Sequence, residues 1–219
     1  KVDYLINIIE RLINNLIMLN KTAKILSVAL HPFLIPIYIM VLLLFTNTVH
    51  SYYPWKIKVY LLWNITLYST VLPVLTLELL KRFRRLRNKR LSKREYTIIA
   101  LLVGAICYVL CAITMMNVAS LAIFRKIAMV GMMCNIFCLA ALPFGRISTH
   151  LTAMGAAVAL FTMLNILGEI SLFWILLGTI LCSGIIASAR LYMGRNRSRQ
   201  LFIGFVCGFL ISAAVMMWL

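Results

Sequence analysis

Three histidines, His31, His50 and His150, are the candidates for proton transfer in this sequence. His150 ends the run RISTH, in which Arg146 precedes it by four residues. An imidazole can donate or accept a proton near neutral pH, and a guanidinium can neutralise a phosphate. An ionisable side chain at the edge of an apolar segment is often functional, although it can also simply extend its polar end into water.

Basic and polar residues gather in three islands along the chain. The first, at 81–94, reads KRFRRLRNKRLSKR and holds nine basic residues. The second is RISTH, at 146–150, and the third, at 188–208, reads SARLYMGRNRSRQLFIGFVCG. Two apolar segments separate each island from the next, so a helical bundle would bring all three to one membrane face. Such convergence is what a site for a charged lipid headgroup requires.

The composition excludes a soluble enzyme, a disordered chain and a fibrous protein. Hydrophobic residues make up 63% of the 219 residues and charged residues only 12%, and the mean hydropathy is +1.00. Soluble domains average about 45–50% apolar residues, so this chain needs lipid as its solvent. The net charge of +17 then indicates membrane topology and anionic headgroups rather than nucleic acid.

The elements that must position these residues are apolar helices. Residues 1–22 have helical amphipathic spacing, typical of an interfacial helix or of a helix packed on its own bundle. Seven apolar segments follow, at 25–45, 59–80, 96–116, 123–142, 151–167, 170–189 and 201–218. Most approach the roughly 20 residues that a spanning helix needs. Residues 23–219 are therefore predicted to form an all-α transmembrane bundle with six or seven spans.

Two further patterns concern the geometry of that bundle. Pro32 and Pro36 are expected to bend the first helix, because each removes a backbone donor. His31 then either extends into water at that bend or, if it is functional, faces His150. Small residues spaced four apart, as in the pair Gly204 and Gly208, predict close contact between helices.

The distribution of lysine and arginine predicts the orientation. If the spans alternate, 18 of these residues share the side of the 81–94 island, and four lie on the other side. By the positive-inside rule, the N-terminus and the basic loops are expected to be cytoplasmic, in a cell (inner) membrane. Basic residues that bind phosphate on the outer face would produce the same bias.

The order and spacing of the islands resemble the type 2 phosphatidic acid phosphatase (PAP2) superfamily, and most of all a bacterial branch of multi-helix membrane members. The branch carries HPxxxP in its first helix, as residues 31–36 do here. The superfamily carries K-x6-RP, then PSGH, then SR-x5-H-x3-D followed by a glycine. The second motif matches Ser148 and His150, with Ile147 in place of its proline and Thr149 in place of its glycine.

The other two motifs match in part, and the resemblance covers roughly residues 25–218. In the third motif Arg190 and Gly204 match, while Asn196 replaces the histidine and Gln200 replaces the aspartate. In the first motif Lys89 aligns, and Tyr96 and Thr97 occupy the Arg-Pro positions.

The family mechanism shows which departures matter. In the family, the third-motif histidine attacks phosphorus, its aspartate orients it, and the second-motif histidine protonates the leaving alcohol. The resemblance therefore implies catalytic positions at His150, Asn196 and Gln200. It also implies phosphate-binding positions at Lys89, Arg146, Ser148, Thr149 and Arg190. Because an amide is not nucleophilic at neutral pH, Asn196 cannot form the phospho-intermediate, and such a loss costs several orders of magnitude in rate.

Three functions stay open at this point. The first is binding of phosphorylated lipid or isoprenoid headgroups, with lost or weak phosphatase activity. The second is a working lipid phosphatase with a rearranged site, in which His31 or His150 is the nucleophile. The third is a non-catalytic membrane assembly subunit. We expect no metal, no cofactor and no nucleic-acid partner, whereas a membrane-protein partner or a homo-oligomer is compatible with the first and third functions.

Overall fold

The computed structural model describes residues 22, 27, 29–46, 49–86, 92–116, 121–143, 145, 147–166, 172–194 and 196–218, and every regular element in these ranges is helical. The long helices are α5 (Lys93–Thr114), α6 (Ala122–Ala141), α7 (Thr149–Ile166), α8 (Phe173–Tyr192) and α9 (Ser198–Trp218). Before them stand α2 (Ile35–Phe45), a short 3-10 helix η1 (Val49–Tyr52), α3 (Trp55–Thr66), the π-helical turn η2 (Leu67–Val71) and α4 (Leu72–Leu86). The predicted helix over 1–22 lies outside the described residues, apart from Thr22.

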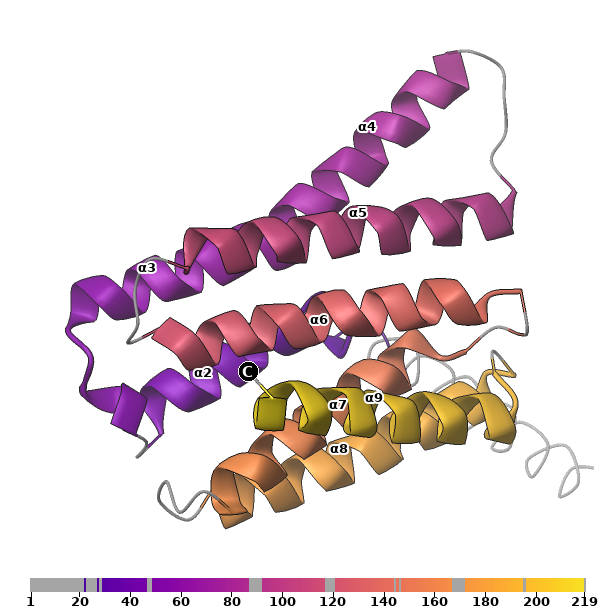
Figure 1. The fold of residues 1–219 in the computed structure, drawn as a ribbon. Helices are drawn as coiled ribbons and strands as arrows, with labels where there is room; N and C mark the ends of the chain where they lie inside the picture. The colour runs from indigo at the N-terminus through magenta and orange to yellow at the C-terminus, as the bar shows by residue number, and fades with distance from the viewer. Residues whose placement is uncertain are drawn as a thin grey trace, which may run out of the picture.

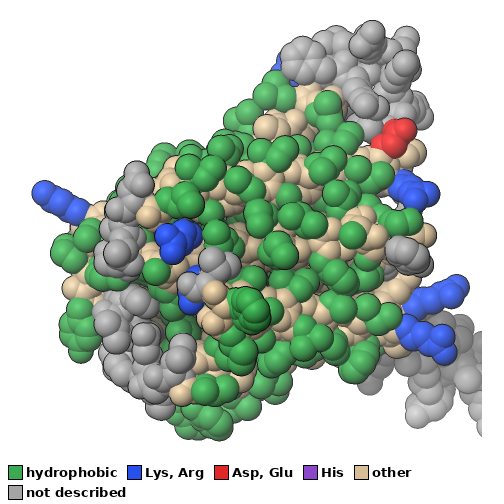
Figure 2. All heavy atoms as spheres, viewed as in Figure 1, with side chains coloured by type: hydrophobic (Ala, Val, Ile, Leu, Met, Phe, Trp, Pro, Cys, Tyr) green, Lys and Arg blue, Asp and Glu red, His purple; other side chains and the backbone are tan. Residues whose placement is uncertain are grey.

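Six helical stretches are long and apolar enough to cross a membrane. They are Trp55–Arg82, Arg94–Thr114, Ala122–Ala141, Thr149–Ile166, Phe173–Tyr192 and Ser198–Trp218. The predicted fold class, an all-α bundle with six or seven candidate spans, is thus confirmed. Figure 2 shows the flank of the bundle covered by hydrophobic side chains, which is the surface that lipid would contact.

The first apolar segment differs from the predicted bent helix. Residues 31–34 form a turn, and α2 begins only at Ile35. At about 1.5 Å per residue, its 11 residues cover roughly 16 Å, which is about half of a membrane span. Pro36 stands in the first turn of α2, where no intrahelical N–H is needed. Pro36 therefore starts α2, and the turn at 31–34 separates this half-length helix from the helical residues Ser27 and Ala29 before it (Figure 1).

The π-helical turn η2 fixes the position of that entering turn. Pro73 offers no N–H to the carbonyl of Ser69 four residues earlier, and its ring clashes with that carbonyl, which accounts for the wider helical turn. Ser69 and Thr70 lie in this wider turn, and both hydroxyls donate to the carbonyl oxygen of Phe33, Thr70 at 3.1 Å. A helix far along the chain thereby holds the segment that precedes α2.

Among the described helices, α7 and α9 share the most extensive contact. A Cβ added to Gly208 would lie 2.0 Å from the carbonyl oxygen of Thr152, and one added to Gly155 would lie 2.1 Å from that of Phe205. Only glycine permits two helix backbones to approach this closely. The close contact predicted from the small residues is thus present, and it holds the start of α7 against the first turns of α9.

The two ends of the bundle carry different side chains. The basic end is the one where α4 and α8 finish and where α5, α7 and α9 begin (Figure 1). The opposite end carries the exposed side chains of Trp55, Trp174 and Trp218. Tryptophan is enriched where a membrane meets water, so this end has the composition of an interfacial belt.

Candidate functional site

His150 is held in one tautomer at the start of α7. It is 8% exposed, and its Nδ1 is 3.0 Å from Nη1 of Arg190, in the last turn of α8. Because a guanidinium can only donate, Nδ1 must accept, which places the imidazole proton on Nε2. Nε2 lies 3.3 Å from the carbonyl oxygen of Ser27 and donates to it. The single N–H of this neutral imidazole therefore already donates to a backbone carbonyl.

Arg190 links the start of α7 to the turn before α9. Its Nε donates to Oδ1 of Asn196 at 3.0 Å. The chain can reverse between α8 and α9 because Gly194 has a φ of 62°, a conformation that glycine adopts without strain. The structure thus joins His150, Arg190 and Asn196, which come from the second and third polar islands, into one hydrogen-bonded cluster.

The ring of His31 packs against the ring of His150. The two rings are 5.5 Å apart between centroids and meet edge to face, so His31 faces His150 as two-histidine chemistry requires. Nδ1 of His31 lies 3.4 Å from the backbone N–H of Phe33, from which it accepts. His31 precedes α2 and stands outside the six candidate spans. Burial, and then the positive charge of Arg190, lower the pKa of His31 below its ordinary value of 6.5, which favours the neutral imidazole.

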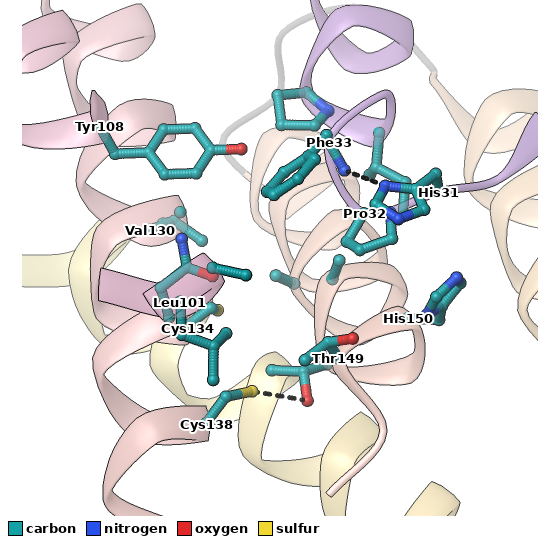
Figure 3. A pocket seen from close by; sticks show the side chains of 18 of the residues that line it. His31, Pro32, Phe33, Leu101, Tyr108, Val130, Cys134, Cys138, Thr149 and His150 are labelled. Atoms are coloured by element: carbon teal, nitrogen blue, oxygen red, sulfur yellow. Dashed lines mark hydrogen bonds between the residues drawn. The ribbon is translucent and has the colours of Figure 1, made fainter. Parts of the chain in front are cut away.

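Both histidines border a cavity of about 520 Å³ between the start of α2 and helices α4 to α7. This volume falls within the range of about 300–1,000 Å³ that is typical of ligand pockets. Most of the lining is apolar, and Figure 3 shows Tyr108 entering from the side opposite His31 and Pro32. Tyr96 and Thr97, at the Arg-Pro positions of the first motif, also line it.

The other predicted site residues do not all lie at the cavity. Thr149 lines the cavity, whereas Ser148 is 1% exposed and its hydroxyl has no hydrogen-bond partner within the described part of the chain. Oε1 of Gln200 accepts from the backbone N–H of Arg197 at 3.1 Å, as a residue of the first helical turn does in a capping box. Lys89 and Arg146 lie outside the described residues.

The sequence analysis missed polar residues that line the cavity from inside the spans. Asn135, in α6, and Tyr108, in α5, both lie in its wall. The hydroxyl of Tyr108 is 3.5 Å from Oγ of Ser69, in the π-helical turn. A signal was available for Asn135, because a polar side chain inside an apolar span is expensive and often functional.

Fold and site together define an integral membrane protein of the polytopic helical class, with a partly buried His–Arg–Asn cluster beside a cavity within the bundle. No protein-family model, curated protein or solved structure matches this chain. Its function is therefore inferred from the geometry of the cluster and the cavity.

Proposed function

We propose that this protein binds the phosphorylated headgroup of a membrane lipid at the cluster of His150, Arg190 and Asn196, with weak or no hydrolysis. The observation that carries the proposal is the placement of Arg190, whose guanidinium is 3.0 Å from both His150 Nδ1 and Asn196 Oδ1. These two contacts orient the planar guanidinium, the side chain best suited to a phosphate. The resemblance to the PAP2 superfamily supports the same function.

The chemistry of the cluster argues for binding rather than turnover. An amide cannot attack phosphorus at neutral pH, so Asn196 cannot carry a phosphoryl group as the family histidine does. In its imidazolium form His150 could protonate a leaving alcohol, and Arg190 retains the charge that stabilises phosphate oxygens. Binding groups and an acid are thus present, while the covalent step lacks its nucleophile.

A second candidate function, a rearranged lipid phosphatase, is favoured by the position of His31. Its ring is 5.5 Å from that of His150, and its lowered pKa keeps it in the neutral form that can act as a nucleophile. In this scheme an imidazole nitrogen of His31 bonds to phosphorus as the phosphorus–oxygen bond to the lipid breaks. The imidazolium form of His150 gives a proton to the departing alkoxide, and water later cleaves the phosphorus–nitrogen bond, which releases phosphate, restores the imidazole of His31 and returns a proton to His150.

One set of assays on purified protein in nanodiscs separates these functions. Lipid binding and phosphate release are measured for phosphatidic acid, phosphatidylglycerol phosphate and polyprenyl pyrophosphate, with unphosphorylated diacylglycerol as control. We expect binding that weakens as salt increases, and little turnover. Robust hydrolysis that is lost in His31→Ala and His150→Ala but kept in Asn196→Ala would establish the rearranged phosphatase. If none of the phosphorylated lipids binds more tightly than diacylglycerol, the proposed function is wrong and the assembly subunit is favoured.

We also propose that the basic end, which holds the cluster, faces the cytoplasm across a cell (inner) membrane. The excess of lysine and arginine on that side supports this orientation. Cysteines introduced at Ser92, at the basic end, and at Tyr52, at the opposite end, are both exposed. They should react with an impermeant thiol reagent from the inside and the outside of cells, respectively. Labelling of both from one side would contradict this topology.

A further inference from the structure

Asn135 is a polar side chain inside an apolar membrane span. It stands in α6 among apolar residues and lines the cavity, and its Nδ2 has no hydrogen-bond partner within the described part of the chain. Inside a bilayer there is no bulk water to satisfy such a group, so polar side chains in spans pair with one another or serve a ligand. Asn135 is therefore a candidate to bind a hydrogen-bond acceptor of a ligand in the cavity.

Gly104 leaves room for this amide on α5. A Cβ added to Gly104 would lie 2.9 Å from Nδ2 of Asn135 and 3.7 Å from the ring of Phe33. An amide carries two N–H donors on one side and an acceptor on the other. Because Nδ2 gives up no hydrogen bond when the amide turns, Asn135 can present its N–H groups to the cavity at little cost.

Asn135 lies at a definite depth below the headgroup cluster. Sγ of Cys138 is 3.7 Å from Oγ1 of Thr152, which sets these two residues level on α6 and α7. α6 runs toward the basic end and α7 runs away from it (Figure 1), so Asn135 is three residues deeper than Cys138, and His150 is two residues shallower than Thr152. At about 1.5 Å of rise per residue, Asn135 is roughly 7 Å deeper than His150.

This depth fits the chemistry of a glycerolipid. A few bonds of the glycerol backbone separate its phosphate from the nearest ester carbonyl, and a carbonyl oxygen is an acceptor for an amide N–H. The other polar group at the deep side of the cavity, the hydroxyl of Tyr108, already lies 3.5 Å from Ser69 Oγ. The remaining wall includes apolar side chains such as Leu101 and Ile127, which suit an acyl chain. An isoprenoid chain has no ester carbonyl and would offer Asn135 no acceptor.

We infer that the ligand is a phosphorylated glycerolipid with ester-linked chains, and that Asn135 donates a hydrogen bond to one of its ester carbonyls while the phosphate lies at Arg190. This inference rests on the proposed function and deepens it, because it selects a glycerolipid over an isoprenoid. Asn135 is thereby a specificity-determining residue, and Gly104 is the position that accommodates it.

The test compares lipids that differ only in the carbonyl. Binding of dioleoyl phosphatidic acid, its ether-linked analogue without carbonyls, and polyprenyl phosphate is measured in nanodiscs with the wild-type protein and with Asn135→Leu. Wild type should prefer the ester lipid to the ether lipid by roughly 3- to 10-fold, the worth of one neutral hydrogen bond. Asn135→Leu should lose this preference by weakening the ester lipid alone. Ser212→Ala is the matched control, because Ser212 has a buried hydroxyl without a partner but lies outside the cavity wall, so the preference should persist.

The outcomes distinguish the inference from the proposed function. If wild type does not discriminate between ester and ether lipids, or if Asn135→Leu weakens both equally, Asn135 does not bind the carbonyl and the inference is wrong. If polyprenyl phosphate binds more tightly than the glycerolipids, the substrate class is wrong but the headgroup site stands. If no phosphorylated lipid binds, the proposed function itself fails. If Asn135→Leu does not fold, the comparison of ester and ether lipids bound to wild type still tests the inference.

Discussion

The two faces of α7 have opposite surroundings. On one face its backbone touches that of α9, so closely that a single methyl group at Gly155 or Gly208 would collide with a carbonyl oxygen. On the other face His150, Ala156 and Leu160 border a cavity of about 520 Å³. Side chains in a protein interior normally fill such space, so a helix that borders a cavity must be held from elsewhere. We infer from this contrast that the α7–α9 contact makes α7 rigid. The other face of α7, the open face that borders the cavity, forms the site.

The largest expected effect comes from Gly208→Ala, which disrupts the contact of α7 with α9, the packed face of α7. The new Cβ would lie 2.0 Å from the carbonyl oxygen of Thr152, so α7 and α9 must separate. We expect the free energy of unfolding to fall by about 3 kcal/mol, at the upper end of the usual cost of overpacking. Gly178→Ala, in α8, is the control, because nothing lies within 4 Å of its added Cβ. Thermal unfolding in detergent measures both, and equal stability of the two variants would contradict the role of the α7–α9 contact.

On the open face, Arg190→Gln should have the next largest effect. The substitution keeps a polar side chain but removes the charge that pairs with phosphate, and a charge-assisted hydrogen bond contributes about 1.5–3 kcal/mol. We therefore expect phosphatidic acid to bind at least about tenfold more weakly, with a smaller dependence on salt. Arg199→Gln removes an exposed arginine of α9 and should change binding little. Equal losses in both variants would show that binding is a general attraction between basic residues and anionic lipid.

The missing nucleophile gives the third prediction, a gain of activity in Asn196→His. Oδ1 of Asn196 is 3.0 Å from Nε of Arg190, so an imidazole at this position would stand beside a phosphate held by the arginine. Phosphate release should increase at least about tenfold over the parent, because the covalent step regains its nucleophile. Adding His150→Ala should abolish the gain by removing the acid. A folded variant that binds lipid without any increase would show that position 196 lacks the family geometry.

The packed face was largely predictable from the sequence and the open face only in part. Apolar segments of suitable length predict the helices, and the small-residue spacing of Gly204 and Gly208 predicts the close pair, because both signals are local. His150 and Arg190 could be placed together only through the resemblance to a family and the alternation of the spans. The hydrogen bond between them joins residues 40 positions apart, which no local pattern specifies.

Two features of the open face escaped prediction for a physical reason. The helix start at Ile35 depends on hydroxyls of Ser69 and Thr70, which bind the carbonyl of Phe33 from more than 30 positions away. The position of Asn135 depends on Gly104 in another helix. Both are tertiary contacts, and neither a proline pair nor a single asparagine in an apolar run indicates its partner.

The smallest expected effect is electrostatic and concerns His31 on the open face. Burial, followed by the charge of Arg190, lowers the pKa of His31 in the folded protein below 6.5. Between the lowered pKa and 6.5 the unfolded chain binds more protons than the folded protein, so the free energy of unfolding decreases as the pH falls. The stability contributed by neutral His31 is complete above pH 6.5 and is lost as the pH falls toward the lowered value. Wild type should therefore have a lower Tm at pH 5 than at pH 7.5.

His31→Gln should lose less over the same interval, because glutamine does not titrate. The remaining histidines and the five carboxylates are common to both proteins, so the difference between their pH profiles isolates His31. Saturating phosphatidic acid sharpens the test, since a phosphate beside Arg190 offsets its charge and raises the pKa of His31 toward the ordinary value. The difference between the two profiles should then shrink. Identical profiles without lipid would show that His31 is not buried against the arginine, and would remove the support for His31 as a nucleophile.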